Sequence, residues 1–292
     1  MGFFEAIILG LIQGLTEFLP VSSSAHLRIA GEFLPSASDP GATFTAITQI
    51  GTELAVILYF RNDIVRILGR WFGQFRSSKG AHAANISRTD PDVRLGWLII
   101  IGTVPIVLVG YFAQEYIRTA FRSLWLIAIV LIVFGIILGV ADILGRRVRE
   151  ITELSYRHGI LIGLAQMLAL VPGVSRSGAT MTAGLALGYT RPAAARFGFL
   201  LAIPAVFGSG LYELVTAVTC DPVLDAAEGC GTGFGLAETA VATLVAFGVG
   251  FAVIAFLMRY IQRGSFLPFV IYRVLLGGTL IVLLSVGTLQ PL

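Results

Sequence analysis

Charged residues are scarce in this sequence, and hydrophobic residues are abundant. Of the 292 residues, 13% are Asp, Glu, Lys or Arg, whereas 56% are hydrophobic. A soluble domain usually carries about 25% charged residues. So few charges could not cover the surface of a soluble protein, and we therefore predict that lipid surrounds most of the chain. The net charge of +3 is too small to indicate a nucleic-acid partner.

Cysteine is nearly absent, which argues against thiolate metal sites. The two cysteines, Cys220 and Cys230, lack the CxxC spacing of such a site. Both fall in one acidic loop that we expect outside the cell, where an oxidising compartment permits a disulfide. This placement leaves a disulfide and two free thiols equally open.

Long apolar segments take up much of the chain. A membrane-spanning helix needs about 20 residues. Residues 3–12 are apolar but too few to cross, and without a basic n-region they are not expected to be a cleavable signal peptide. We predict an all-α integral membrane protein with six transmembrane helices, at roughly 43–60, 95–113, 124–144, 195–219, 236–258 and 266–288.

Two further apolar segments, ending near residue 34 and spanning roughly 158–188, are interrupted by Pro20 and Pro172. Proline fits poorly inside a helix, and a serine-rich turn follows each one. A helix that enters the membrane, turns at the serines and returns fits both segments better than a simple span. Such backbone is tolerated where protein or a polar cavity surrounds it, so we predict two re-entrant helical hairpins.

The order of these segments repeats along the chain. One broken hairpin and three spans fill residues 1–144, and the same series fills residues 145–292. With three crossings in each half, the second half must be inverted relative to the first. We therefore predict one integral membrane domain built from two inverted-topology repeats, with the functional site at the interface between them.

Arginines indicate the orientation of this arrangement. The segments 61–94 and 145–157 are rich in Arg, whereas the segment 220–235 contains neither Arg nor Lys. Basic loops favour the cytoplasmic side. We therefore expect both termini on the periplasmic or external face, with the first hairpin entering from outside and the second from inside.

The stretch from Gln13 to His26 places an amide, a carboxylate, three serine hydroxyls and an imidazole among apolar residues. Gln13 and Glu17 are four residues apart and share a helix face. A carboxylate at membrane depth is costly and usually faces a cavity or a partner. We therefore favour Glu17 as a metal ligand or general base over a helix-packing hydrogen bond.

The serine run Ser22–Ser24 has a plainer explanation, because serines often cap or pack helices in membranes. His26, however, lies three residues after Ser23, which makes a nucleophile with a nearby base plausible. The other interpretation of His26 is an interfacial histidine without a role.

The second motif reads Pro-Gly-Val-Ser-Arg-Ser-Gly-Ala-Thr over residues 172–180. Backbone N–H groups in turns of this kind bind anions, and a guanidinium fits phosphate oxygens with two parallel hydrogen bonds. We therefore favour phosphate binding by Arg176 over snorkelling of its side chain to the membrane interface.

The other polar side chains within spans are less informative. Any of the charged ones can form a structural ion pair, which is the interpretation that we favour for Arg273. For the amides we favour hydrogen bonding between helices over lining of the site. They are Glu53, Glu213, Glu238, Arg273, Gln49 and Gln166.

With these motifs, the chain resembles the undecaprenyl-pyrophosphate phosphatase family, the bacitracin-resistance type of bacterial inner-membrane enzyme. Gln13 and Glu17 match the (Glu/Gln)-x-x-x-Glu motif of that family, and Pro20 to Ser23 with His26 match its Pro-Val-Ser-Ser run. Residues 172–180 match its second motif at every position, and Tyr272-Arg273 also resembles the family. The likeness extends over nearly the whole chain.

The resemblance implies hydrolysis of C55 polyprenyl pyrophosphate with a divalent cation, Mg²⁺ or Ca²⁺. The family roles carry over to Glu17, Ser23, His26 and Arg176 as catalytic residues, with Glu17 and Gln13 at the metal. Gln13 is the neutral option at its motif position, which puts a two-carboxylate metal site in doubt. The expected substrate-binding residues are Gln13, Ser22, Ser24, Gly173, Ser175, Ser177, Gly178 and Thr180.

The expected partners are the polyprenyl pyrophosphate and membrane lipids, and a homodimer is left open. Attack by Ser23 on phosphorus and attack by a water are also both left open. One rival function is a secondary transporter or flippase, because inverted repeats with broken helices are typical of transporters. Another is the type-2 phosphatidate phosphatase superfamily, which also uses Ser-Arg and histidine motifs, but no histidine follows Arg176 here.

Overall fold

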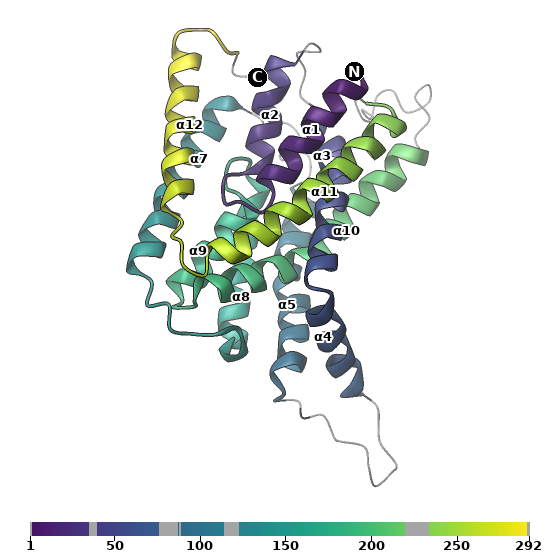
Figure 1. Ribbon diagram of the computed structural model, residues 1–292, viewed down its shortest axis with the longest axis vertical. Helices are drawn as coiled ribbons and strands as arrows, with labels where there is room; N and C mark the ends of the chain where they lie inside the picture. The colour runs from purple at the N-terminus through teal and green to yellow at the C-terminus, as the bar shows by residue number, and fades with distance from the viewer. Residues whose placement is uncertain are drawn as a thin grey trace.

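The computed structural model describes residues 2–34, 40–75, 87, 89–113, 123–219 and 234–290, and every element named in them is helical (Figure 1). Helix α1 begins and α12 ends at the same end of the molecule, and the α4–α5 pair projects from the opposite end. Cys220 and Cys230 lie outside the described residues, so their disulfide stays a prediction.

Among the described residues, six helices are long and apolar enough to cross a membrane, which confirms the number that the sequence predicted. Their bounds lie within a few residues of those expected. The six helices are α3 (Gly41–Tyr59), α5 (Pro91–Phe112), α7 (Leu124–Leu144), α10 (Arg191–Thr219), α11 (Leu236–Tyr260) and α12 (Leu267–Ser285).

The start of α5 shows why hydropathy alone predicted that some helices begin later than they do. Asp90 precedes the helix, and its side chain accepts hydrogen bonds from the backbone N–H groups of Asp92 at 2.9 Å and Val93 at 3.4 Å. Pro91 fills the first helical position, where a missing N–H costs nothing. A polar capped turn therefore precedes the apolar part of the helix.

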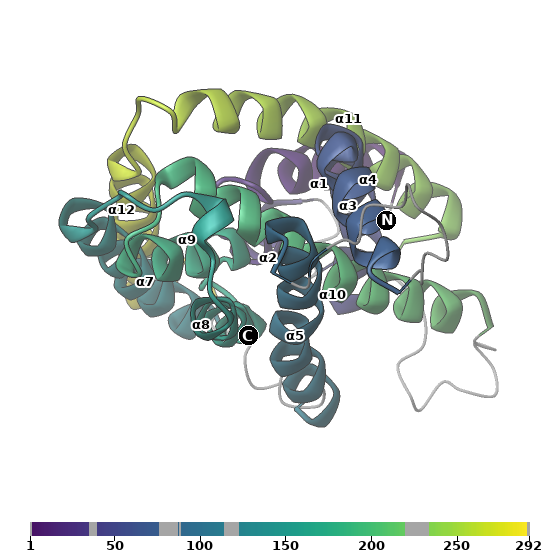
Figure 2. The same cartoon turned by 90° about the horizontal axis from the view of Figure 1, so that it is seen from below.

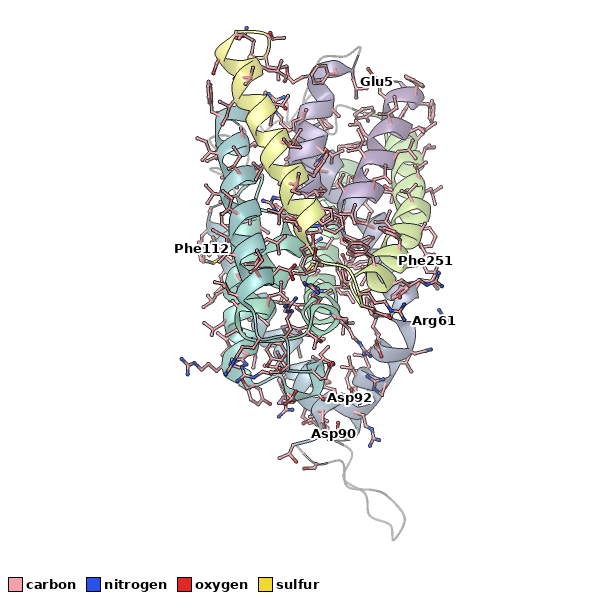
Figure 3. All side chains as sticks on the ribbon, turned by 60° about the vertical axis from the view of Figure 1, so that its left-hand side comes forward. Glu5, Arg61, Asp90, Asp92, Phe112 and Phe251 are labelled. Atoms are coloured by element: carbon pink, nitrogen blue, oxygen red, sulfur yellow. The ribbon has the colours of Figure 1, made fainter. Side chains whose placement is uncertain are left out.

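The outer surface of these helices is apolar. Ile136 is 50% exposed, Leu244 70% and Leu275 65%. A soluble monomer rarely exposes continuous apolar patches of this kind, so the surface itself indicates a lipid environment. Of the labelled charged residues, Glu5 lies near one end and Asp90 and Asp92 near the other, with Arg61 between the middle and that second end (Figure 3).

Four shorter α-helices form two helix–turn–helix segments. In the first, α1 (Phe3–Thr16) is joined to α2 (Ser23–Phe33) by residues 17–22. In the second, α8 (Tyr156–Met167) and the 3₁₀ turn η3 (Leu168–Leu170) lead into α9 (Arg176–Ala186). Both proline-containing motifs therefore lie between two short helices, as their sequences predict.

The basic segment 61–94, expected as a loop, contains a further helix, α4 (Arg61–Gly73). Its Arg66 bonds Asp63 at 3.1 Å and Asp92 of α5 at 2.9 Å. Trp71 packs against Trp97 of α5, with ring centroids 5.2 Å apart. Contacts with α5 thus stabilise a charged helix that lacks the apolar length of a span.

The short 3₁₀ turn η2 (Ile151–Glu153) follows α7.

Glycines allow several helices to approach at backbone distance. A Cβ on Gly10 would lie 2.5 Å from the carbonyl oxygen of Ala242, where α1 meets α11. A Cβ on Gly163 would lie 2.5 Å from the carbonyl oxygen of Gly102, where α8 meets α5. Figure 2 shows α11 along one side of the molecule, close to α1 and α3. These small residues set the spacing of the bundle.

A buried carboxylate connects three helices at the end of α7. Asp142 accepts from Arg191 Nε at 2.6 Å and Nη2 at 3.1 Å, and from the backbone N–H of Phe266 at 2.9 Å. Asp142 is 4% exposed. The pair therefore fixes the starts of α10 and α12 to the end of α7.

We predict that Asp142→Ala destabilises the protein by about 3 kcal/mol or more, because it leaves a largely buried guanidinium and a buried N–H without a partner. The measurement is the apparent Tm of the purified protein in detergent. Asp92→Ala is the control, since its ion pair is more exposed and is worth about 1 kcal/mol at most. Equal shifts for the two variants would contradict the prediction.

Candidate active site

The two motifs of the sequence meet in the structure. Ser177 Oγ donates to the backbone carbonyls of Glu17 at 3.3 Å and Leu19 at 3.2 Å. The guanidinium of Arg176 forms an ion pair with the carboxylate of Glu17. The turn before α9 therefore packs directly on the turn between α1 and α2 (Figure 1).

Both turns have the same unusual backbone conformation. Ser22 has φ 74° and Ser175 has φ 72°, and each immediately precedes a helix. A left-handed φ is uncommon for residues other than glycine. Local bonds support the second turn, because Ser175 Oγ accepts from the N–H of Gly178 at 3.1 Å. The turns are therefore held in a conformation that their sequence does not favour.

Glu17 is the centre of the polar cluster. Its Oε2 accepts from Ser23 Oγ at 2.6 Å and from Gln13 Nε2 at 2.7 Å, while Oε1 pairs with Arg176. The Glu17 side chain is 4% exposed. One carboxylate thus contacts the predicted nucleophile and the predicted phosphate-binding arginine.

His26 is directed elsewhere. Its Nδ1 lies 2.7 Å from the carbonyl oxygen of Ser22, and its Nε2 lies 2.6 Å from the hydroxyl of Tyr272, on which the imidazole stacks. Both ring nitrogens are therefore engaged. In this geometry the hydroxyl of Ser23 is bonded to Glu17 and not to His26.

Arg273 of α12 is hydrogen-bonded to both turns, the one before α2 and the one before α9. It is 0% exposed and donates to the carbonyl oxygens of Pro20 in the first turn, Gly173 and Val174 in the second, and Leu131 of α7, at 2.8–3.1 Å. Its expected partner was a carboxylate, and that prediction was wrong for the described residues, because four carbonyls use its donors instead.

An elongated cavity of about 540 Å³ begins at the polar cluster. Its polar end is formed by Glu17, Arg176 and the serines of both turns, and its remaining wall is largely apolar. Wall residues include Ala42 at the start of α3 and Tyr111 near the end of α5. The cavity therefore extends toward the end of the molecule where α1 begins (Figure 1).

The predicted substrate-binding residues fall into two groups. The first lines the cavity and consists of Ser22, Ser24 and Ser175, together with the catalytic candidates Glu17, Ser23 and Arg176. The second lies behind the turns and consists of Gln13, Gly173, Ser177, Gly178 and Thr180. Thr180, for example, is fully buried and donates to the carbonyl of Arg176 at 3.0 Å. Ser177, Gly178 and Thr180 of this group shape the turn before α9, whereas Gln13 contacts the carboxylate of Glu17.

Sequence reasoning assigned no site role to three residues that the structure places here. Glu53 lies 3.9 Å from Arg176, Tyr272 bonds His26, and Arg273 holds both turns. The available signal was polarity within an apolar span. That signal does not distinguish an ion pair from a site residue.

The other polar residues of the spans also have defined places. Gln49 and Glu213 line the cavity, and Thr43 Oγ1 donates to Glu213 at 2.8 Å. Gln166 is buried, but its amide has no hydrogen-bond partner among the described residues. The interhelical hydrogen bond expected of Gln166 was therefore wrong for this part of the chain.

The fold and the cluster together define a multi-pass helical membrane protein with a buried Glu–Ser–Arg site at the inner end of an apolar cavity. The family described as bacitracin resistance protein BacA matches residues 6–279. The chain belongs to this family, as its motifs indicated.

Full-length relatives agree with this assignment. The undecaprenyl-diphosphatase of Micrococcus luteus is 59% identical over 290 residues, which are 99% of this chain and 100% of the relative. That of Clavibacter michiganensis is 60% identical over 289 residues, 99% of each chain. The undecaprenyl-diphosphatase 2 of Agrobacterium fabrum is 54% identical over 290 residues, 99% and 98% of the two chains.

We predict that Arg273→Met lowers the free energy of unfolding by about 3 kcal/mol or more, because four buried carbonyls then lose their donor. Arg273→Lys, with a single ammonium in place of the planar guanidinium, should restore only part of the loss. The apparent Tm in detergent measures both. The control is Arg259→Met at an exposed position of α11, expected to shift stability by about 0.5 kcal/mol at most. A Tm for Arg273→Met equal to that of the control would contradict this role.

Proposed function

We propose that this protein hydrolyses undecaprenyl pyrophosphate to undecaprenyl phosphate and inorganic phosphate. The main support is the contact of Glu17 with both Ser23 and Arg176 at the end of an apolar cavity. The relatives named undecaprenyl-diphosphatase support it. The reaction would recycle the lipid carrier for cell-wall synthesis and confer resistance to bacitracin.

The cavity suits a lipid with an anionic head group. Arg176 would hold the terminal phosphate, because its planar guanidinium matches phosphate oxygens. Ser22, Ser24 and Ser175 line the same end and would donate hydrogen bonds to the pyrophosphate. The polyprenyl chain would leave along the apolar wall, between helices and into lipid.

Ser23 is the nucleophile in our proposal, with Glu17 as its base. Ser23 Oγ already donates to Glu17 Oε2 at 2.6 Å, so the carboxylate is placed to accept the proton as Oγ attacks the terminal phosphorus. The phosphoanhydride bond breaks, and undecaprenyl phosphate leaves as a stable anion. The oxygen of a water molecule then attacks the phosphoserine phosphorus and the Oγ–phosphorus bond breaks. Glu17 gives its proton back to Ser23 Oγ, and inorganic phosphate leaves with one proton of the water while the other passes to solvent.

The residues around Glu17 also fit a divalent cation. Gln13 Oε1 is buried without a hydrogen-bond partner, beside a carboxylate that already contacts the amide of Gln13. Oxygen donors of this kind, completed by substrate phosphates and water, are what Mg²⁺ or Ca²⁺ takes. We propose that Glu17 and Gln13 hold the cation, which would neutralise phosphate charge during transfer.

His26 has an orienting role in this proposal. Its contacts with the carbonyl of Ser22 and the hydroxyl of Tyr272 position the turn that carries Ser23. Proton transfer by His26 would require a different side-chain position, in which one ring nitrogen leaves its present partner.

We also propose that α1–α2 and α8–α9 are re-entrant hairpins of two inverted repeats, residues 1–144 and 145–292. The support is a shared local pattern. Each turn serine with a left-handed φ follows a glutamine by nine residues, Gln13 before Ser22 and Gln166 before Ser175. In addition, α1 packs on α11 as α8 packs on α5. The site then lies at the interface between the repeats.

We place the protein in the bacterial inner membrane with the cavity open to the periplasmic face. The cavity extends toward the end opposite α4, whose arginines favour the cytoplasm. The termini would share the periplasmic face with the cavity.

We predict that Glu17→Ala, Ser23→Ala and Arg176→Ala each lower kcat for phosphate release from undecaprenyl pyrophosphate by about 100-fold or more, because each removes a preorganised group. Chelator should abolish wild-type activity, and Mg²⁺ or Ca²⁺ should restore it. Arg259→Ala and Ser285→Ala, away from the site, are the controls. Wild-type turnover in Arg176→Ala would contradict the assignment, and full activity of Ser23→Ala would favour direct attack by water.

The orientation predicts where a thiol reagent reaches the cavity. In a Cys220→Ser, Cys230→Ser background, Ser24→Cys should react with a membrane-impermeant thiol reagent in spheroplasts, and a substrate analogue should block the reaction. Arg61→Cys at the opposite end is the control and should react only in inside-out vesicles (Figure 3). Reaction of Ser24→Cys confined to inside-out vesicles would reverse the orientation.

A further inference from the structure

Glu53 is a second carboxylate at the site, contributed by a helix outside both sequence motifs. It lies in the middle of α3, is 1% exposed, and its Oε2 is 3.9 Å from Arg176 Nη2. The same guanidinium pairs with Glu17. Two buried carboxylates therefore share one arginine.

The oxygen atoms around this arginine are incompletely satisfied. Glu53 Oε1 is buried and has no hydrogen-bond partner among the described residues, and the same holds for Gln13 Oε1. A buried polar atom without a partner is destabilising. The first oxygen belongs to a side chain that pairs with Arg176 and the second to a side chain that bonds Glu17, so both lie on residues around the same ion pair and lack a donor of positive charge.

The space between these groups is small. Glu17, Glu53 and Arg176 line an inner cavity of about 10 Å³, separate from the lipid-sized one. This volume is about the minimum that holds one water molecule, and Phe18 and Phe199 form part of its apolar wall. A single ion is small enough for this space, whereas an organic ligand is not.

The balance of charge points the same way. One guanidinium faces two carboxylates, and a pyrophosphate would bring further negative charge to Arg176. A second cation at the site would offset this excess of negative charge. Carboxylate and amide oxygens are the ligands that hard divalent cations prefer.

We infer that Glu53 is the second carboxylate ligand of the divalent-cation site, beside Glu17 and the amide oxygen of Gln13. Glu53 thereby supplies the negative charge that the motif lacks at Gln13. This inference rests on the proposed function for its cation, but it concerns cation binding and is tested without turnover.

The experiment measures Mn²⁺ binding to the purified full-length protein in detergent, without substrate, from the electron paramagnetic resonance signal of the free ion. Glu53→Gln keeps the size of the side chain and removes its charge, so the Kd for Mn²⁺ should rise about 10-fold or more. Glu53→Asp keeps the charge on a shorter side chain and should raise the Kd less. Retention volume and apparent Tm establish that each variant is folded.

The matched control is Glu238→Gln, which removes a carboxylate near the start of α11 and should leave the Kd unchanged. A Kd for Glu53→Gln equal to that of wild type overturns the inference. If hydrolysis falls at the same time, Glu53 acts by positioning Arg176. Should Glu53→Gln fail to fold, an unchanged Kd for Glu53→Asp would overturn it equally.

A separate assay keeps the proposed function apart from this test. Wild-type protein that binds Mn²⁺ through Glu53 but releases no phosphate from undecaprenyl pyrophosphate would leave the cation site standing and refute the proposed reaction. Wild-type protein that hydrolyses the substrate without binding Mn²⁺ would support the proposed reaction and refute the cation site.

Discussion

The site depends on the bonds that Arg273 makes to backbone carbonyls of both turns. Each turn leaves carbonyl oxygens facing the interior, where water cannot reach them, and one guanidinium of α12 satisfies Pro20, Gly173 and Val174 together. A planar group with five donors in fixed directions can do this, whereas an ammonium cannot. Because the bonds reach both turns, the position of one turn fixes the position of the other, and the side chains that they carry meet with little freedom.

The contact between Glu17, Ser23 and Arg176 follows from this arrangement. Phosphoryl transfer needs positioned charge more than unusual chemical groups, and rigid supports provide that positioning better than mobile loops. The left-handed φ of Ser22 and Ser175 is a cost that the surrounding structure must offset. In return, the helix that begins after each serine directs its first side chain, Ser23 or Arg176, toward the same carboxylate.

Much of this could be predicted from the sequence, because the relevant signals are local. An apolar segment such as residues 124–144 has few alternatives to a spanning helix, and α7 has those bounds. The helices before Pro20 and Pro172 stop a few residues ahead of each proline, α1 at Thr16 and the turn η3 at Leu170. The first turn of α5 was missed because its cap at Asp90 is polar, and α4 was missed because its stability comes from contacts with α5.

The sequence by itself determined that the protein is embedded in a membrane, that six helices of the described residues are long enough to span it, and that two serine-rich turns interrupt shorter helices, since composition, length and proline act locally. Only the tertiary structure decided the partners. Ser23 bonds Glu17 and not His26, Arg273 bonds carbonyls and not a carboxylate, and Glu53 reaches Arg176 from a helix without a motif. These contacts join residues far apart in the chain, and their distances follow from the packing of α3, α9 and α12.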